Sequence, residues 1–345
     1  MKDKKNIIFT IIFIILIFFA YCFVFKDYSL SKFMNAFYEC KHGYLLLALL
    51  CMFLWVFFEG LFLKVIFKKL DYKISWYQAI GYVFTEAYFS LVTPGSSGGQ
   101  PVQMYEMGRD KIPYRVSSIV VFINTMFYKL SLVLIFFIGL IIYFKDFLYF
   151  SPIFKIMVLI GFLVNVIIIT FFILLIYTKK LIISITKIIT NILFRFGLVK
   201  NEEEFNNKIK ESLDDYLKAA SYIRTHRKTL FQTFSIVFLQ RLSIMMVYYL
   251  VCRAFEVNSF SLVYAISIQA FLTVAMDSIP IPGGVIVGEG LIMEANEALK
   301  VLNYSKDITL IFRGISVYLL VIISLIYYLI FHYKKRKKVI LIKDE

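Results

Sequence analysis

Two breaks rich in proline and glycine carry many of the residues in this sequence that could do chemistry. The first break spans residues 93–101 (TPGSSGGQP), and its candidate binding residues are Pro94, Gly98, Gly99 and Gln100. Glycines let backbone amides approach an anion, and a helix that begins after such a break offers free N–H groups and the positive end of its dipole. This pattern suits a phosphate head group. The simpler interpretation is a helix break that permits tight packing.

The second break spans residues 277–284 (DSIPIPGG) and is followed by Gly288 and Glu289. Its candidate head-group residues are Pro282, Gly283 and Gly284. Asp277 and Glu289 are acidic in apolar surroundings, and ionisable residues at membrane depth are costly and usually mark a pathway or a relay. We predict that these two carboxylates act as counter-charges or proton carriers. Alternatively, Asp277 only caps the following segment and Glu289 only pairs with an arginine.

Three basic residues, Lys129, Arg241 and Arg313, lie within or near the ends of three different apolar runs. Arginine can bind a phosphate through two parallel hydrogen bonds, and lysine binds it as a point charge. We therefore assign Arg313 to head-group binding, and Lys129 and Arg241 to a charge relay or to counter-charges. The alternative is that all three neutralise acidic side chains such as Glu86 and only hold the helices together.

Composition indicates the environment in which these residues must be placed. The chain has 345 residues, of which 60% are apolar and 18% charged, whereas a soluble protein has roughly 45–50% apolar and about 25% charged residues. This excludes a soluble globule, a disordered chain and a disulfide scaffold. Runs of about 20 apolar residues predict membrane-spanning helices. Six such runs occur, at residues 6–25, 44–67, 116–144, 153–177, 229–251 and 308–331.

Two shorter apolar runs, 76–93 and 261–279, end at the two breaks. The positive-inside rule bears on whether they cross the membrane. The net charge is +15, and residues 178–228 hold 11 of the 38 Lys and Arg residues. If all eight runs crossed, this loop would lie outside. With six crossings and two re-entrant segments, 26 of the 38 basic residues fall on one side, including both termini.

We therefore predict an all-α polytopic membrane protein with about six spanning helices and two re-entrant, broken helical hairpins. Residues 1–345 form one integral membrane domain, with a cytoplasmic amphipathic loop at 178–228 and a basic cytoplasmic tail at 332–345. Each break has the same place in its half of the chain, which is the pattern of an inverted repeat. Because irregular backbone at membrane depth must face protein or a water-filled cavity, the two breaks should face each other near a central polar site.

Several motifs are absent from the sequence. The four cysteines form no CxxC pair, and with three scattered histidines they give no metal-site spacing. The sequence also lacks a phosphate-binding loop, a nucleophile elbow and an HExxH motif. We expect no metal, no cofactor and no catalytic residues in this chain.

The segments TPGSSGGQPVQMYEM and DSIPIPGGVIVGEGLIMEAN, with Arg313 downstream, resemble the membrane region of the lysylphosphatidylglycerol synthase/flippase family over residues 5–335. In full-length synthases a soluble domain transfers an aminoacyl group from tRNA to phosphatidylglycerol, and the membrane region moves the product between leaflets. The resemblance implies that residues 94 and 98–100 correspond to the first family motif. It implies that residues 282–284, Glu289 and Arg313 correspond to the second. The chain ends shortly after its last apolar run, so we expect no soluble transferase domain.

We predict a lipid translocase of the bacterial cell membrane that binds an anionic, aminoacylated or polyprenyl-phosphate lipid. The alternative is a membrane component of phosphatidylglycerol lysyltransferase-type lipid modification, linked to resistance against cationic peptides. A scaffolding membrane protein is a third class. The expected partners are membrane lipids. We expect no nucleic acid, and tRNA would enter only through a separate transferase partner.

Overall fold

The computed structural model describes residues 14–15, 28–195, 213, 217, 221, 225–299, 301 and 303–343, and these residues form helices and connecting turns without strands. Five helical segments are long and apolar enough to cross a membrane. They are α3 (His42–Lys69), α6 (Tyr114–Ile142), α8 (Pro152–Tyr177), α11 (Arg227–Ala254) and the segment Ser305–Tyr333. The last segment combines α14 (Ser305–Arg313), a π-helical turn η3 (Gly314–Tyr318) and the start of α15 (Leu319–Lys343).

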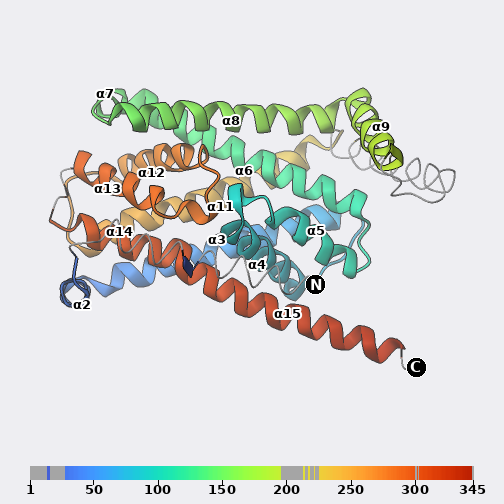
Figure 1. Ribbon diagram of the computed structural model, residues 1–345, viewed down its shortest axis with the longest axis horizontal. Helices are drawn as coiled ribbons and strands as arrows, with labels where there is room; N and C mark the ends of the chain where they lie inside the picture. The colour runs from blue at the N-terminus through green and yellow to red at the C-terminus, as the bar shows by residue number, and fades with distance from the viewer. Residues whose placement is uncertain are drawn as a thin grey trace.

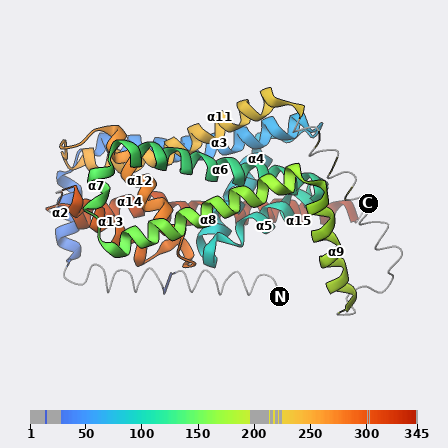
Figure 2. The same ribbon diagram turned by 90° about the horizontal axis from the view of Figure 1, so that it is seen from above.

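These segments match five of the six predicted spans, and the chain is an all-α polytopic membrane protein. The remaining predicted span, 6–25, lies outside the described residues apart from residues 14 and 15. The five segments run along the long axis of the molecule, and α3 packs beside α11 (Figures 1 and 2). Short helices α2 (Leu30–Glu39) and α7 (Phe144–Leu148) lie at one end, and α9 (Lys179–Arg195) turns away from the axis of α8 at the other.

Both predicted broken hairpins are present. The first consists of α4 (Trp76–Val92), a single 3₁₀ turn η1 (Pro94–Ser96) and α5 (Gly99–Arg109). The second consists of α12 (Leu262–Met276), the 3₁₀ turn η2 (Pro282–Gly284) and α13 (Val287–Ala298). At 1.5 Å per residue, the 17 residues of α4 and 15 of α12 extend about 26 and 23 Å, short of a hydrocarbon core of about 30 Å.

The two hairpins enter the bundle from opposite ends and their tips meet at its centre (Figure 1). The first enters from the end that holds the C-terminus, and the second enters from the end that holds α2. The contact between η1 and η2 joins the two breaks directly. The prediction that the breaks face each other is therefore confirmed.

Local sequence explains why each hairpin helix begins and turns where it does. Ser75 and Gln78 form a capping box at the start of α4, and the side chain of Ser261 caps α12. At the tips, Gly95, Gly283 and Gly284 have φ angles of 60°, 58° and 59°. Glycine adopts this left-handed conformation at little cost, so the chain can reverse within a few residues.

Close backbone packing holds α12 inside the bundle. A side-chain carbon added to Gly161 of α8 would lie 1.7 Å from the carbonyl oxygen of Val274 in α12. On another face, a carbon added to Gly139 of α6 would lie 2.6 Å from Cβ of Ser267. Small residues at helix crossings allow such contact in membranes, where packing rather than burial from water drives helix association.

Basic residues concentrate at one end of the molecule. Lys68, Lys69 and Arg109 end α3 and α5 there, and Lys179 begins α9 at the same end. At the opposite end Lys41 forms an ion pair of 2.7 Å with Glu256, and this exposed contact lowers the pKa of the Glu256 carboxyl. The amphipathic loop predicted at 178–228 includes α9, but residues 196–212, 214–216, 218–220 and 222–224 of that loop lie outside the described part.

We expect Gly161→Ala to destabilise the protein, because the added methyl group must push α8 away from the α12 backbone. Overpacking of this kind typically costs about 1–3 kcal/mol. The measurement is the free energy of unfolding of the purified protein in detergent. Gly43→Ala is the matched control, since nothing lies within 4 Å of the added carbon. Equal stability of the two variants would contradict the packing described for α8 and α12.

Candidate functional site

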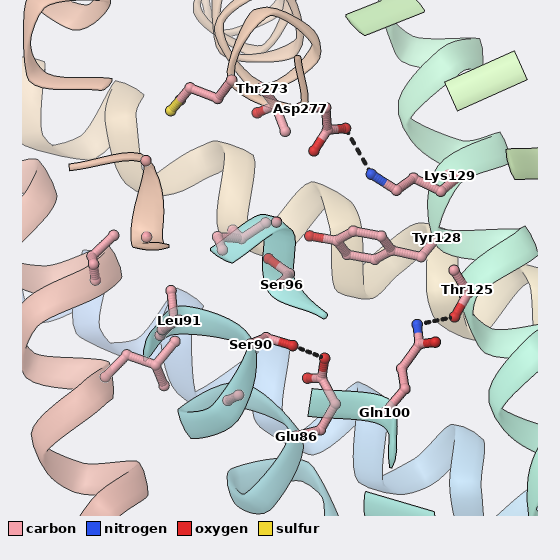
Figure 3. A pocket seen from close by; sticks show the side chains of 18 of the residues that line it. Glu86, Ser90, Leu91, Ser96, Gln100, Thr125, Tyr128, Lys129, Thr273 and Asp277 are labelled. Carbon is pink, nitrogen blue, oxygen red and sulfur yellow. Dashed lines mark hydrogen bonds and ion pairs between the residues drawn. The ribbon is translucent and has the colours of Figure 1, made fainter. Parts of the chain in front are cut away.

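A cavity of about 580 Å³ lies where the two hairpin tips meet. Spanning helices α3, α6, α8 and α11 contribute to its wall together with both hairpins and the segment from Phe312 to Leu320. The volume is within the range of small-molecule sites, about 300–1,000 Å³. Figure 3 shows polar side chains from the first hairpin, α6 and α12 pointing toward this space. Six of the predicted site residues line it: Gln100, Lys129, Asp277, Gly283, Gly284 and Arg313.

The first break contributes its tip and the start of α5. Gly95, Ser96 and Ser97 line the cavity, and Gln100 donates from Nε2 to Oγ1 of Thr125 at 2.6 Å. Pro94 begins η1 and is exposed. The two serines and Gln100 thus supply neutral hydrogen-bonding groups next to the start of a helix whose first turn has no side-chain cap.

Gly98 and Gly99 lie behind the tip and do not line the cavity. A carbon added to Gly99 would lie 2.0 Å from Oγ of Ser90 and 2.7 Å from the carbonyl oxygen of Glu86. A carbon added to Gly98 would lie 2.7 Å from the Thr93 side chain. Both glycines let α5 pack directly on α4, which fits the packing interpretation. A binding role for them stays a prediction.

The second break is held by a buried arginine. Arg313 donates from Nε to Oε1 of Glu289 at 2.8 Å and from Nη2 to the carbonyl oxygen of Gly283 at 2.7 Å. Tyr318 donates to the same Oε1 at 2.7 Å. Pro282 begins η2, is buried and does not line the cavity. Among the described residues, Nη1 of Arg313 has no hydrogen-bond partner, so the cavity-lining guanidinium keeps one free group.

A second ion pair crosses the cavity. Lys129 of α6 donates to Oδ2 of Asp277 at 2.7 Å (Figure 3). Nδ2 of Asn165 in α8 donates to the same oxygen at 3.0 Å. Asp277 is the C-terminal cap of α12. The pair therefore ties α6 and α8 to the point where the second hairpin begins to turn, and it combines two residues that were predicted separately.

Arg241 of α11 lies behind the cavity wall. Its guanidinium carbon is 3.6 Å from the ring centroid of Tyr128, and Nη1 donates to the hydroxyl of Tyr128, which does line the cavity. The side chain is only 2% exposed, and its Nε and Nη2 atoms have no hydrogen-bond partner. Arg241 is thus separated from the cavity by one aromatic ring.

Two further carboxylates line the cavity, and the sequence analysis assigned neither a site role. Glu59 accepts from Nδ2 of Asn124 at 3.1 Å and from Nε2 of Gln240. Glu86 accepts from Oγ of Ser90 at 2.6 Å (Figure 3). A carboxylate inside an apolar run was the available signal for both residues, since such residues are costly at membrane depth.

The buried pair of Arg313 and Glu289 gives a stability prediction. Arg313→Met should cost roughly 3–5 kcal/mol, because it leaves the Glu289 carboxylate buried without its partner. The double variant Arg313→Met/Glu289→Gln should recover part of that loss. The free energy of unfolding in detergent is the measurement for the single and the double variant. The exposed pair is the control: Lys41→Met should cost at most about 1 kcal/mol. If the double variant loses as much unfolding free energy as Arg313→Met and Glu289→Gln lose together, the two side chains are not electrostatically coupled.

The chain is similar to a known protein family over nearly its whole length. A family model described as "Lysylphosphatidylglycerol synthase TM region" matches residues 6–334, a range that includes both hairpins and every cavity residue named above. A search of curated proteins gave no match. The matched family consists of membrane proteins related to lipid modification or translocation. The chain belongs to the lysylphosphatidylglycerol synthase transmembrane-region family.

Proposed function

We propose that this protein binds a phospholipid or polyprenyl-phosphate head group in the central cavity and moves the lipid between the two leaflets. The observation that carries the proposal is a central cavity with polar groups in its wall, at the point where two broken hairpins from opposite ends of the bundle meet. A head group can cross a hydrocarbon layer only if polar partners replace its water. The cavity supplies such partners at the middle of the bundle.

The lining supports an anionic or zwitterionic head group. Nη1 of Arg313 offers a positively charged donor for a phosphate, and the positive end of the α5 dipole lies at the tip of the first hairpin. Ser96, Ser97 and Gln100 add neutral groups on the facing tip. On the other side, Glu59 and Glu86 offer acceptors for an amine, as an aminoacylated lipid would require. Phosphate and amine subsites would thus lie in one cavity.

Alternating access follows from the symmetry of the entry directions. The hairpin tips contact each other at the centre of the bundle, so parting them toward one end would open the cavity to one leaflet. Lipid tails would remain among the exposed apolar side chains of the spanning helices. Inverted repeats with broken helices at the membrane midplane are a common basis for such motion.

We further propose that the end rich in Lys and Arg faces the cytoplasm of a bacterial cell, with both termini on that side. In a variant without native cysteines, a cysteine at position 200 should react with an impermeant thiol reagent only after the cytoplasmic side is exposed. A cysteine at position 41 lies at the start of α3, at the end of the molecule opposite Lys68 and Lys69, and should react in intact cells. The reverse labelling pattern would overturn this orientation.

Lipid movement itself is tested in vesicles that contain the purified protein and one fluorescent lipid at a time. The panel is phosphatidylglycerol, an aminoacylated phosphatidylglycerol and a polyprenyl phosphate. We expect Ser97→Trp to slow the transfer by at least about tenfold, because the indole would fill the cavity at the hairpin tip.

Ser31→Trp is the matched control for that experiment, since Ser31 is exposed on α2. It should keep the wild-type rate. No accelerated movement of any lipid in the panel by the wild-type protein would refute the proposed function. Equal rates for the two tryptophan variants would place the lipid path outside the cavity.

A further inference from the structure

Glu59 and Glu86 differ from the other acidic residues around the cavity in having no basic partner. Asp277 is paired with Lys129 and Glu289 with Arg313. Within the described part of the chain, neither Glu59 nor Glu86 forms an ion pair with a Lys, Arg or His side chain, and each accepts hydrogen bonds only from neutral groups. Two carboxylates therefore face the cavity without a neutralising charge.

The two carboxylates also interact with each other. Glu59 is 4% exposed, Glu86 is partly buried, and both line the same cavity, where two negative charges would repel each other. Like charges in one poorly hydrated site cannot both ionise easily, and one proton shared by the pair removes the repulsion. Such a proton belongs to the pair rather than to either residue.

The amide groups around Glu59 can serve both of its protonation states. Asn124 and Gln240 each donate an N–H to the carboxylate, and the carbonyl oxygen of each amide, Oδ1 and Oε1, is buried without a partner. Rotating either amide by half a turn would present that oxygen as an acceptor for a carboxyl O–H. A lysine or arginine could satisfy only the ionised state. The two amides can therefore hold the Glu59 carboxyl group either with or without a proton.

The cavity gives the pair access to water. Both glutamates line it, and Ser90 occupies only Oε1 of Glu86. The other charged or titratable groups around the pair are Tyr128 and Lys129 from α6, Arg241 from α11, Asp277 from α12 and Arg313 from α14. Lys129 is paired with Asp277 and Arg313 with Glu289. Arg241 donates to the hydroxyl of Tyr128, whose ring separates it from the cavity.

We propose that Glu59 and Glu86 together bind one proton, delivered through the cavity, and that this proton is the coupling ion for lipid movement. The coupling rests on the function proposed above, whereas the proton site does not. Release of the proton adds one negative charge to a cavity in which the other carboxylates are already neutralised. The same site would then hold an amine-bearing head group more strongly, so that proton and lipid exchange with each other.

The proton site is tested with dicyclohexylcarbodiimide, an apolar reagent that modifies protonated carboxyl groups. The full-length protein in vesicles is treated over a range of pH, and the modified residues are identified by mass spectrometry. We expect modification of the pair, mainly at the more accessible Glu86, and its loss as the pH rises. Glu289 should remain unmodified because its carboxyl group is buried and bonded to Arg313.

A variant distinguishes a shared proton from two independent carboxyl groups. In Glu59→Gln the repulsion is gone, so Glu86 should hold its proton at least about tenfold more weakly. Its modification profile then moves to lower pH. Glu297→Gln, which changes an exposed carboxylate of α13, should leave the profile unchanged. If Glu59→Gln does not fold, the wild-type profile still decides whether a protonated carboxyl group exists.

Failure to modify either glutamate at any pH at which the wild-type protein is folded would overturn the proton site. If the pH profile of Glu86 modification is unchanged in folded Glu59→Gln, the two residues do not share a proton. Coupling is read from fluorescent-lipid movement with and without a pH gradient across the vesicle. Wild-type movement that ignores the gradient would exclude coupling. Absence of all lipid movement with Glu86 still modified would refute the lipid function and leave the proton site standing.

Discussion

Backbone and charged groups inside a membrane must find their partners within the protein, and the rest of this structure depends on that constraint. Continuous helices meet it without help. Two breaks at the bundle centre do not, because a 3₁₀ turn leaves N–H and C=O groups unpaired. The protein places the two breaks against each other, encloses them with spanning helices and uses Arg313 to bond the carbonyl oxygen of Gly283. The cavity is the space that this arrangement leaves.

The hairpins can reach the centre because backbones approach closely along their length. Gly99 lies against Ser90 in the first hairpin, and Gly161 of α8 lies against the Val274 carbonyl of α12 in the second. Neither approach tolerates a side chain. Hydrocarbon offers no hydrophobic driving force between helices, so such contacts supply much of the packing energy. Glycine in this protein therefore has two separate uses, reversal at the tips and close approach along the helices.

Charge around the cavity is divided between structure and function. Two ion pairs, Lys129 with Asp277 and Arg313 with Glu289, connect the second hairpin to its surroundings. Buried pairs of this kind fix geometry more than they add stability. The glutamates of α3 and α4 form no ion pair within the described residues, and Glu59 connects α3 to α6 and α11 only through neutral amides. Their surroundings of amides and a serine can accommodate a change of charge, which is what an ion-coupled cycle would need.

The sequence by itself determined the solvent, the spans and the breaks. Apolar runs predicted the five spanning segments within a few residues, and the glycines and prolines after 76–93 and 261–279 predicted both hairpins, because these signals are local. Only the tertiary structure decided which charges pair, that Gly98 and Gly99 pack against α4 instead of lining the cavity, and that Glu59 faces it beside Glu86. Those outcomes depend on helix rotation and depth, which follow from contacts between segments far apart in the chain.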